Sequence, residues 1–194
     1  MSLHPTRPGP IPDSYWLIDG MLLAGEYPGT HREGGTREKL TKFLDAGIRT
    51  FIDLTETNEP LAKYDGLLRE LSDDRKIETR HLRHSVRDGS IPADRAHMQR
   101  ILSTIREEID AGRPVYVHCW GGIGRTGTVI GCWLVESGLA GEAAIEKIAE
   151  LRANTHDRHM TSPENEDQRA TSVNGWRQNA DRPLSRRTPR PRSR

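Results

Sequence analysis

The sequence lacks any long hydrophobic run. No apolar stretch in its 194 residues approaches the roughly 18 residues that a membrane-spanning helix needs. The N-terminal segment, residues 1–12, is rich in proline and glycine and has no apolar core of the kind found in signal peptides. Charged residues make up 29% of the chain and its mean hydropathy is −0.74. We therefore expect a soluble protein that does not insert into membranes.

Cysteine is also scarce. The two cysteines, Cys119 and Cys132, both lie in the C-terminal half of the chain. Two cysteines do not make the disulfide framework that small secreted domains use. The sequence therefore predicts a protein of a reducing compartment, the cytoplasm.

The chain has little net charge, +1 at pH 7, and its positive charge is unevenly placed. Residues 182–194 contain no acidic residue and six arginines: Arg182, Arg186, Arg187, Arg190, Arg192 and Arg194. A mildly acidic body with a short basic tail is not the profile of a dedicated nucleic-acid binder, so no nucleic-acid partner is expected. The tail mixes arginine with proline and serine and has no apolar periodicity, which predicts disorder over residues 179–194. A contact between this tail and a polyanion is the alternative.

The length suits one domain, expected over residues 14–178 after a flexible segment, residues 1–13. Strands are expected at 15–18 and 21–24, joined as a hairpin through Asp19-Gly20, and at 50–54, 78–82 and 115–118. Helices are expected at 36–46, 64–71, 92–111, 126–137, 142–153 and from 163 onward, with Pro92 at a helix start. This alternation predicts an α/β fold with a central, mainly parallel sheet flanked by helices and an N-terminal β-hairpin. No pattern specifies an oligomeric state.

The segment from Val115 to Thr128 carries the clearest chemical pattern. A strand delivers Cys119 into the loop Trp120-Gly121-Gly122-Ile123-Gly124, and a helix follows immediately. Glycines allow successive backbone N–H groups to turn inward as an anion-binding nest, and the helix N-terminus adds positive potential there. Arg125, six residues after Cys119, has the planar fork that grips two phosphate oxygens. Residues Trp120 to Arg125 are therefore the predicted phosphate-binding residues.

The same groups favour a cysteine thiolate, the nucleophilic form of the side chain. Thr126 is placed to donate its hydroxyl to the sulfur of Cys119, and His118 is expected to orient the loop. Cys119 could instead be a small buried hydrophobe, since that is the commonest role of a lone cysteine. That alternative does not explain why a strand, a glycine-rich loop and a helix start converge on Cys119 and Arg125. The glycine spacing matches neither a Walker A loop nor a dinucleotide-binding fingerprint.

The pattern His-Cys-x5-Arg-Thr resembles the phosphate-binding signature of the protein-tyrosine phosphatase superfamily. Asp88-Gly-Ser-Ile-Pro92 is similar to the acid-bearing loop of that superfamily, and the segment ending at Gln168 is similar to one that positions a water molecule. Leu23-Ala-Gly-Glu-Tyr-Pro-Gly resembles the opening of compact bacterial dual-specificity-like phosphatases of the kinase-associated type. The resemblance covers roughly residues 15–176. It implies a cysteine-dependent phosphatase fold, Asp88 as general acid, a water held by Gln168, and no metal or other cofactor.

Other interpretations of the acidic and histidine residues stay open at this point. Asp88 could be a solvated turn residue, and Gln168 could be an exposed helix residue. Three acids near the carboxyl end of the strand at residues 50–54 are alternative general acids: Asp53, Glu56 and Glu59. Cys132 is expected in the core, with redox pairing to Cys119 as the alternative. Four histidines lack metal-ligand spacing and are expected at the surface or in loops: His81, His84, His156 and His159.

The resemblance implies phosphorylated proteins as substrates, on tyrosine and also on serine or threonine. Val86 and Arg87 stand where the tyrosine-specific enzymes have Trp-Pro before the acid, which argues against strict tyrosine specificity. Inositol phosphates or phosphoinositides are the alternative substrates, although the neutral loop from Trp120 to Ile123 favours protein phosphoresidues. A catalytically silent phosphoresidue-binding module is a further alternative, against which the joint presence of Cys119, Arg125 and Asp88 argues.

Overall fold

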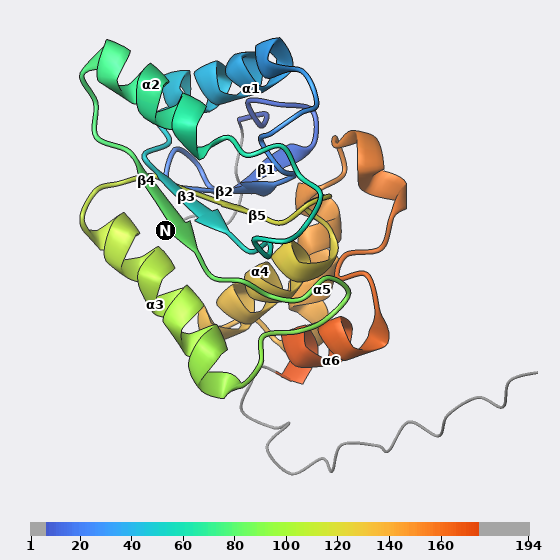
Figure 1. The fold of residues 1–194 in the computed structure, drawn as a ribbon. Coiled ribbons are helices and arrows are strands. Elements are labelled where there is room, and N and C mark those ends of the chain that lie inside the picture. Colours follow the sequence, from blue (N-terminus) through green and yellow to red (C-terminus); the bar gives the residue numbers. More distant parts are fainter. Residues whose placement is uncertain (1–6, 175–194) are drawn as a thin grey trace, which may run out of the picture.

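The computed structural model describes residues 7–174, which form a five-stranded sheet flanked by helices on both faces (Figure 1). The strands stand in the order β1-β2-β5-β3-β4. Their bounds are β1 Ser14–Ile18, β2 Leu22–Gly25, β3 Thr50–Asp53, β4 Arg80–Arg83 and β5 Val115–His118. Only the β1–β2 hairpin is antiparallel, and the other three pairings are parallel. The predicted α/β class, with a mainly parallel sheet and an N-terminal hairpin, is confirmed.

The central strands read as short apolar runs because helices cover both faces of the sheet. Successive side chains point to opposite faces, so Val115 and Val117 of β5 join one apolar cluster and Tyr116 joins the other. In β3, Phe51 and Ile52 divide in the same way. The sheet thus separates two cores.

Helices α1 (Glu33–Asp45) and α2 (Asp65–Arg75) cover the face on which Phe51 and Tyr116 lie (Figure 1). The other face is covered by α3 (Arg95–Asp110), α4 (Gly124–Glu136) and α5 (Gly141–Leu151), while α6 (Glu166–Asn174) packs on α4 and α5. A short 3-10 turn, η1 (His156–His159), links α5 to the segment before α6.

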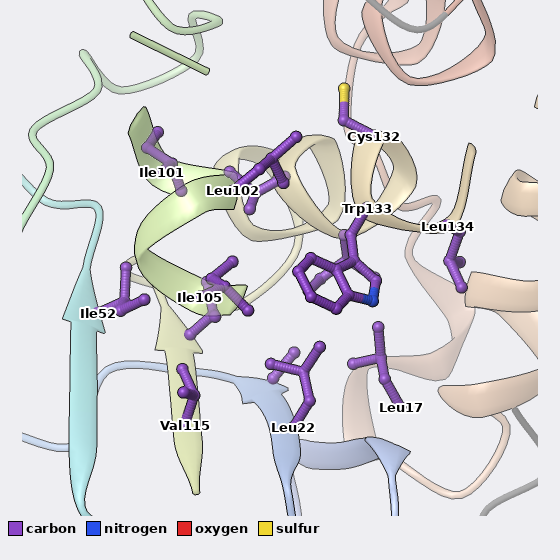
Figure 2. Close-up of a cluster of buried hydrophobic side chains, with 14 of the residues drawn as sticks. Leu17, Leu22, Ile52, Ile101, Leu102, Ile105, Val115, Cys132, Trp133 and Leu134 are labelled. Atoms are coloured by element: carbon purple, nitrogen blue, oxygen red, sulfur yellow. The ribbon is translucent and has the colours of Figure 1, made fainter. Parts of the chain in front are cut away.

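The larger core lies between the sheet and helices α3 and α4. Figure 2 shows Leu22 and Val115 of the strands facing Ile105 of α3 and Trp133 of α4. The apolar residues of α3 recur at Met98, Ile101, Leu102 and Ile105, the spacing of one helix face. This packing fixes the start of α4 against the end of β5.

A polar cluster closes the edge of the sheet at which the parallel strands begin. The carboxylate of Glu108, whose side chain is 6% exposed, accepts hydrogen bonds from the hydroxyl of Thr50 at 2.6 Å and from Arg113 at 2.5 and 2.9 Å. Arg80 adds a bond of 3.1 Å. The pKa of Glu108 falls to about 2, chiefly through the hydrogen bond from Arg113 and against the opposing effect of burial.

One predicted helix start is wrong, and the hairpin turn is longer by one residue than Asp19-Gly20. Helix α3 starts at Arg95 and not at Pro92, because Asp94 is a better N-cap: its Oδ1 accepts the backbone N–H of His97 at 2.7 Å. In the hairpin turn only Gly20 has a positive φ, 72°, and Asp19 does not. The turn contains three residues, 19–21, and closes through the Met21 N–H on the carbonyl of Ile18 at 2.9 Å.

The flexibility expected over residues 1–13 stays a prediction, although residues 7–13 of that segment include side chains and carbonyls that contact the domain. Ile11 is 3% exposed in the core on the α1 side, and the indole N–H of Trp16 donates to the carbonyl of Pro8 at 3.2 Å. Residues 1–6, the predicted domain end at residue 178 and the predicted disordered tail, residues 179–194, lie outside the described residues.

Candidate active site

The predicted loop lies where β5 ends and α4 begins, at the edge of the sheet formed by the carboxyl ends of the parallel strands. This edge is where open α/β sheets place their sites. Cys119, Arg125 and Thr126 are almost completely buried, with 3%, 2% and 0% exposure. The N–H groups of residues 120–125 make no hydrogen bond to any group in the described part of the chain. They are therefore free to bind an anion beside the sulfur of Cys119.

Two glycines give the loop its shape. Gly122 has a φ of +72°, and a Cβ there would lie 2.3 Å from the carbonyl carbon of Gly25 at the end of β2. A Cβ on Gly124 would lie 2.7 Å from the carboxylate of Glu164 and 3.0 Å from the amide of Gln168. Side chains at these positions would push the loop away from β2 and from the start of α6.

Arg125 is held by several neighbours, including the carbonyl of Leu54 at 3.5 Å. Its guanidinium makes a two-pronged ion pair with Glu59, at 2.5 and 3.1 Å, and donates to the carbonyl of Val86 at 3.1 Å. Asp88 contacts the same guanidinium at 2.9 Å with a side chain that is 65% exposed. The structure therefore places Asp88, the general acid that the resemblance implies, beside Arg125. The side chain of Glu59 is only 8% exposed and is paired with Arg125, so its carboxylate is not free in solvent.

A buried polar network supports the loop from behind. The ring of His118 lies 2.7 Å from the hydroxyl of Tyr64 through Nε2 and 3.2 Å from the carbonyl of Cys119 through Nδ1. Burial lowers the pKa of His118 to about 4, although nearby Asp53 opposes this shift. The neutral ring must carry its proton on Nδ1, because a carbonyl only accepts; Nε2 then accepts from Tyr64. His118 thus fixes the backbone of Cys119, as expected.

Asp53 belongs to this network and not to the pocket. Its carboxylate accepts from Thr55 at 2.6 and 2.8 Å, from Arg83 at 2.7 Å and from His81 at 3.1 Å. Burial acts to raise its pKa, but the bonds from His81 and Thr55 and the proximity of His118 hold it well below its ordinary value. Asp53 is therefore wrong as an alternative general acid, because it is fully buried and fully partnered.

His81 was expected at the surface or in a loop, and this prediction is wrong. It lies in β4 with a side chain that is 21% exposed, and Asp53 is its partner. His84 follows β4 and is half-buried, while His156 and His159 are exposed in η1.

Gln168 is completely buried, so it is not an exposed helix residue. Its amide donates to the carbonyl of Ser90 at 3.0 Å and accepts from the N–H of Glu164 at 3.2 Å. It thereby joins the segment after Asp88 to the start of α6, against the phosphate loop. The hydroxyl of Thr126 is buried and has no hydrogen-bond partner within residues 7–174, so the expected bond to the sulfur of Cys119 is not formed in this structure.

Cys132 lies two turns along α4 from the loop. Its thiol donates to the carbonyl of Thr171 in α6 at 3.5 Å, and Figure 2 shows the sulfur pointing away from the strand side chains. Eight residues of helix separate it from Gly124, about 12 Å along the axis. Burial raises the pKa of this thiol to about 12. Cys132 is a core residue, and its position gives no support to pairing with Cys119.

A cavity of about 330 Å³ opens above the loop. Its walls include the predicted residues Cys119, Trp120, Arg125 and Asp88. They also include three residues that the sequence patterns did not single out: Asp157, Met160 and Glu164. Glu56, the remaining alternative acid, is not among the lining residues; its N–H donates to Glu59 at 2.7 Å.

The architecture is that of cysteine-dependent phosphatases. The structure matches Tk-PTP in its active form with a TM-score of 0.61, at 22% identity over 85% of this chain and 96% of that one. It matches the kinase-associated phosphatase with a TM-score of 0.60, at 21% identity over 78% and 83% of the two chains. TpbA of P. aeruginosa, solved in complex with phosphotyrosine, matches with a TM-score of 0.60, at 16% identity over 88% of each chain. These likenesses establish the fold.

A family model described as "Polymorphic toxin system, DSP-PTPase phosphatase" matches residues 27–139, and the chain belongs to this family. Among named relatives, the cdc-14 tyrosine-protein phosphatase of Caenorhabditis elegans is 30% identical over 143 residues, 67% of this chain and 18% of that protein. Protein 067L of Invertebrate iridescent virus 3, whose name calls it a tyrosine phosphatase, is 28% identical over 125 residues, 62% of this chain and 45% of that protein. The chain thus spans less than half the length of these two relatives.

Proposed function

We propose that this protein hydrolyses phosphomonoesters on protein tyrosine, and also serine or threonine, through a phosphocysteine intermediate. One observation carries the proposal: Cys119, the fork of Arg125 and the free N–H groups of residues 120–125 converge on one cavity with Asp88 at its wall. These groups supply a nucleophile, an anion site and a proton donor.

In the first step the thiolate of Cys119 attacks phosphorus, so that a P–S bond forms while the P–O bond to the leaving group breaks. Asp88 gives its proton to the departing oxygen. In the second step water attacks phosphorus, Asp88 takes a proton from it, and the P–S bond breaks to release phosphate. The resemblance assigns Gln168 to position that water, which requires its buried amide to release the carbonyl of Ser90. We assign the unpartnered hydroxyl of Thr126 to stabilise the departing thiolate.

Protein phosphoresidues are favoured as substrates by the names of the relatives and by the loop itself. The loop residues Trp120 to Ile123 carry no charge, and Arg125 is the one cation among the lining residues of the described chain. A polyphosphorylated inositol would find no second cation there. The fold is shared with PTPMT1, solved with PI(5)P, at a TM-score of 0.58, so inositol lipids remain the second substrate class to test. Because Cys119 occupies the nucleophile position and Asp88 the acid position, an enzyme is favoured over a catalytically silent binding module.

We also propose that the protein acts in a reducing compartment such as the cytoplasm. Both cysteines are free thiols, and a thiolate nucleophile is lost when it is oxidised. No helix within residues 7–174 is long and apolar enough to cross a bilayer.

The test is a comparison of the wild type with Cys119→Ser and Cys132→Ser on phosphotyrosine and phosphothreonine peptides. The first variant should lose turnover and still bind the peptides, because Arg125 and the loop N–H groups remain. The second should keep its turnover, because Cys132 contacts α6 and not the cavity. Activity of Cys119→Ser within tenfold of the wild type would remove the proposed mechanism.

A further inference from the structure

The mouth of the cavity carries exposed apolar side chains. In residues 7–174 two large hydrophobic side chains are exposed, Trp120 at 49% and Met160 at 39%, and both line the cavity above Cys119. Exposed apolar surface beside a polar site is typical of a surface that receives a ligand. Trp120 belongs to the phosphate loop, whereas Met160 comes from the segment that follows η1.

The backbone that presents Met160 is firmly anchored. Arg152, only 4% exposed, donates to the carbonyl of Met160 at 2.7 Å and to that of Asp157 at 2.9 Å. On the other side, the carboxylate of Asp13 accepts the N–H of Asp157 at 3.2 Å. The Met160 side chain is therefore exposed on a fixed support and not on a loose loop. A preorganised wall loses little entropy when a ligand packs against it.

Apart from the phosphate-binding arginine, the charged residues that line the cavity are all acidic. Besides Asp88, the lining residues Asp157 and Glu164 carry carboxylates that form no ion pair within the described part of the chain. Their position beside the phosphate site opposes a second phosphate on the ligand and favours a cation there. Neither carboxylate forms an ion pair with Arg125, whose ion-pair partners are Glu59 and Asp88.

We infer that this mouth selects phosphotyrosine flanked by a basic residue. Trp120 and Met160 supply the apolar contacts for the tyrosine ring, and Asp157 and Glu164 attract a neighbouring lysine or arginine. Threonine and serine phosphates are too short to fill the apolar walls, and inositol polyphosphates are repelled by the carboxylates. The inference rests on the proposed function, since it concerns the same cavity, and it narrows the substrate class.

Binding is measured with Cys119→Ser, which removes the chemical step, so that leaving-group effects do not enter. Three peptides share one sequence: phosphotyrosine with flanking lysines, phosphotyrosine with flanking glutamates, and phosphothreonine with flanking lysines. An inositol bisphosphate is the fourth ligand. The lysine-flanked phosphotyrosine peptide should bind at least about tenfold tighter than the phosphothreonine peptide and the inositol bisphosphate, and about threefold to tenfold tighter than the glutamate-flanked peptide.

Second substitutions separate the two features. Met160→Ala should weaken phosphotyrosine binding about fivefold and leave phosphothreonine binding unchanged, while Met160→Leu should retain the wild-type preference. A double variant with Asp157→Asn and Glu164→Gln should bind the lysine-flanked and glutamate-flanked peptides equally well. It should still bind phosphotyrosine more tightly than phosphothreonine. Glu107→Gln, an exposed acid on α3 far from the cavity, is the matched control.

Equal affinities for the tyrosine and threonine peptides, or an unchanged ratio in Met160→Ala, overturn the apolar part of the inference. A preference for flanking glutamates, or tightest binding of the inositol bisphosphate, overturns the charge part. In each of these cases wild-type hydrolysis of the phosphopeptides would still support the proposed function. That function fails separately, if the wild type hydrolyses none of the four ligands.

Discussion

At the scale of single residues, the role of Asp88 is open to a direct kinetic test. A general acid accelerates a reaction only as far as the leaving group needs a proton. Asp88→Asn should therefore lower kcat on a phosphotyrosine peptide by about 10²–10⁴. On p-nitrophenyl phosphate, whose phenolate leaves readily without a proton, the loss should be much smaller. Steady-state kinetics on both substrates measures the difference.

The control is Asp94→Asn, an acid a few residues further along whose N-cap bond an asparagine oxygen can replace. It should leave both rates unchanged. Equal losses on the two substrates in Asp88→Asn would mean that this carboxylate shapes the segment rather than donating a proton.

Glu59 offers a second residue-scale prediction. Because its two oxygens fix both ends of the Arg125 fork, Glu59→Gln should leave the guanidinium less well oriented. A charge-assisted bond of this kind contributes about 1.5–3 kcal/mol, so kcat/KM should fall roughly tenfold or more. The neighbouring Glu56→Gln, which is absent from the cavity wall, should be close to wild type. A Glu59→Gln enzyme with unchanged kcat/KM contradicts the orienting role.

Local spacing in the sequence pointed to Cys119 and Arg125, which are six residues apart, whereas Asp88 was assigned from the resemblance of its segment to a known acid loop. Glu59 was weighed only as an alternative acid, because nothing in its neighbourhood indicates that Arg125, 66 positions away, will be its partner. The same holds for the bond between Asp53 and His81, which depends on the pairing of β3 with β4. Contacts between distant segments become visible only when the strand order is known.

At the scale of elements, the network behind β5 makes folding sensitive to acid. His118 has a pKa of about 4 in the folded protein against 6.5 for an ordinary histidine. Between pH 6.5 and about 4, His118 is therefore protonated in the unfolded chain and neutral in the folded chain. The free energy of unfolding should fall as the pH drops from about 6.5 to about 4, by about 3 kcal/mol from this residue, and the full contribution is present above pH 6.5.

Urea unfolding at several pH values measures that dependence, and His118→Asn should reduce its slope between pH 6.5 and 4. If this variant does not fold, NMR titration of the His118 imidazole in the wild type measures the folded-state pKa directly. A His118 ring that is protonated at pH 5.5 in the folded protein is incompatible with the described network.

The elements themselves were mostly predictable, because their apolar spacing is strong: the four core positions of α3 lie at helical spacing, and β5 is a short apolar run. Their ends were less predictable. At α3 two starting signals compete, a proline at position 92 and an aspartate at position 94, and the side-chain bond of Asp94 decides the start. No local signal in the sequence ranks the two.

At the scale of the whole molecule, stability and chemistry are placed at opposite edges of the sheet. Glu108 ties α3 to the starts of β3 and β4, at the edge far from Cys119. Glu108→Gln should lower the free energy of unfolding by about 1–3 kcal/mol, through loss of charge-assisted bonds in a nearly buried site. Its kcat on a phosphotyrosine peptide should stay at the wild-type value.

The pH dependence gives this prediction a second readout. With a folded pKa of about 2 against an ordinary 4.5, the contribution of Glu108 is complete above pH 4.5 and declines as the pH falls toward 2. The variant and the wild type should therefore converge in stability under acid. Glu107→Gln, its exposed neighbour, should match the wild type throughout; a fall in kcat for Glu108→Gln would show that the two edges are coupled.

The bond from Asp13 to the turn at η1 has a practical consequence for anyone shortening this protein. A fragment that begins at Ser14, where the first strand begins, would keep every element of the sheet and every residue of the phosphate loop. It would lose the carboxylate that steadies residue 157, and with it one of the two supports beneath the wall of the cavity. Such a fragment would also lose the buried side chain of Ile11, and it would misreport how the enzyme ranks its peptides. Substrate profiling should use a chain that includes residues 7–13.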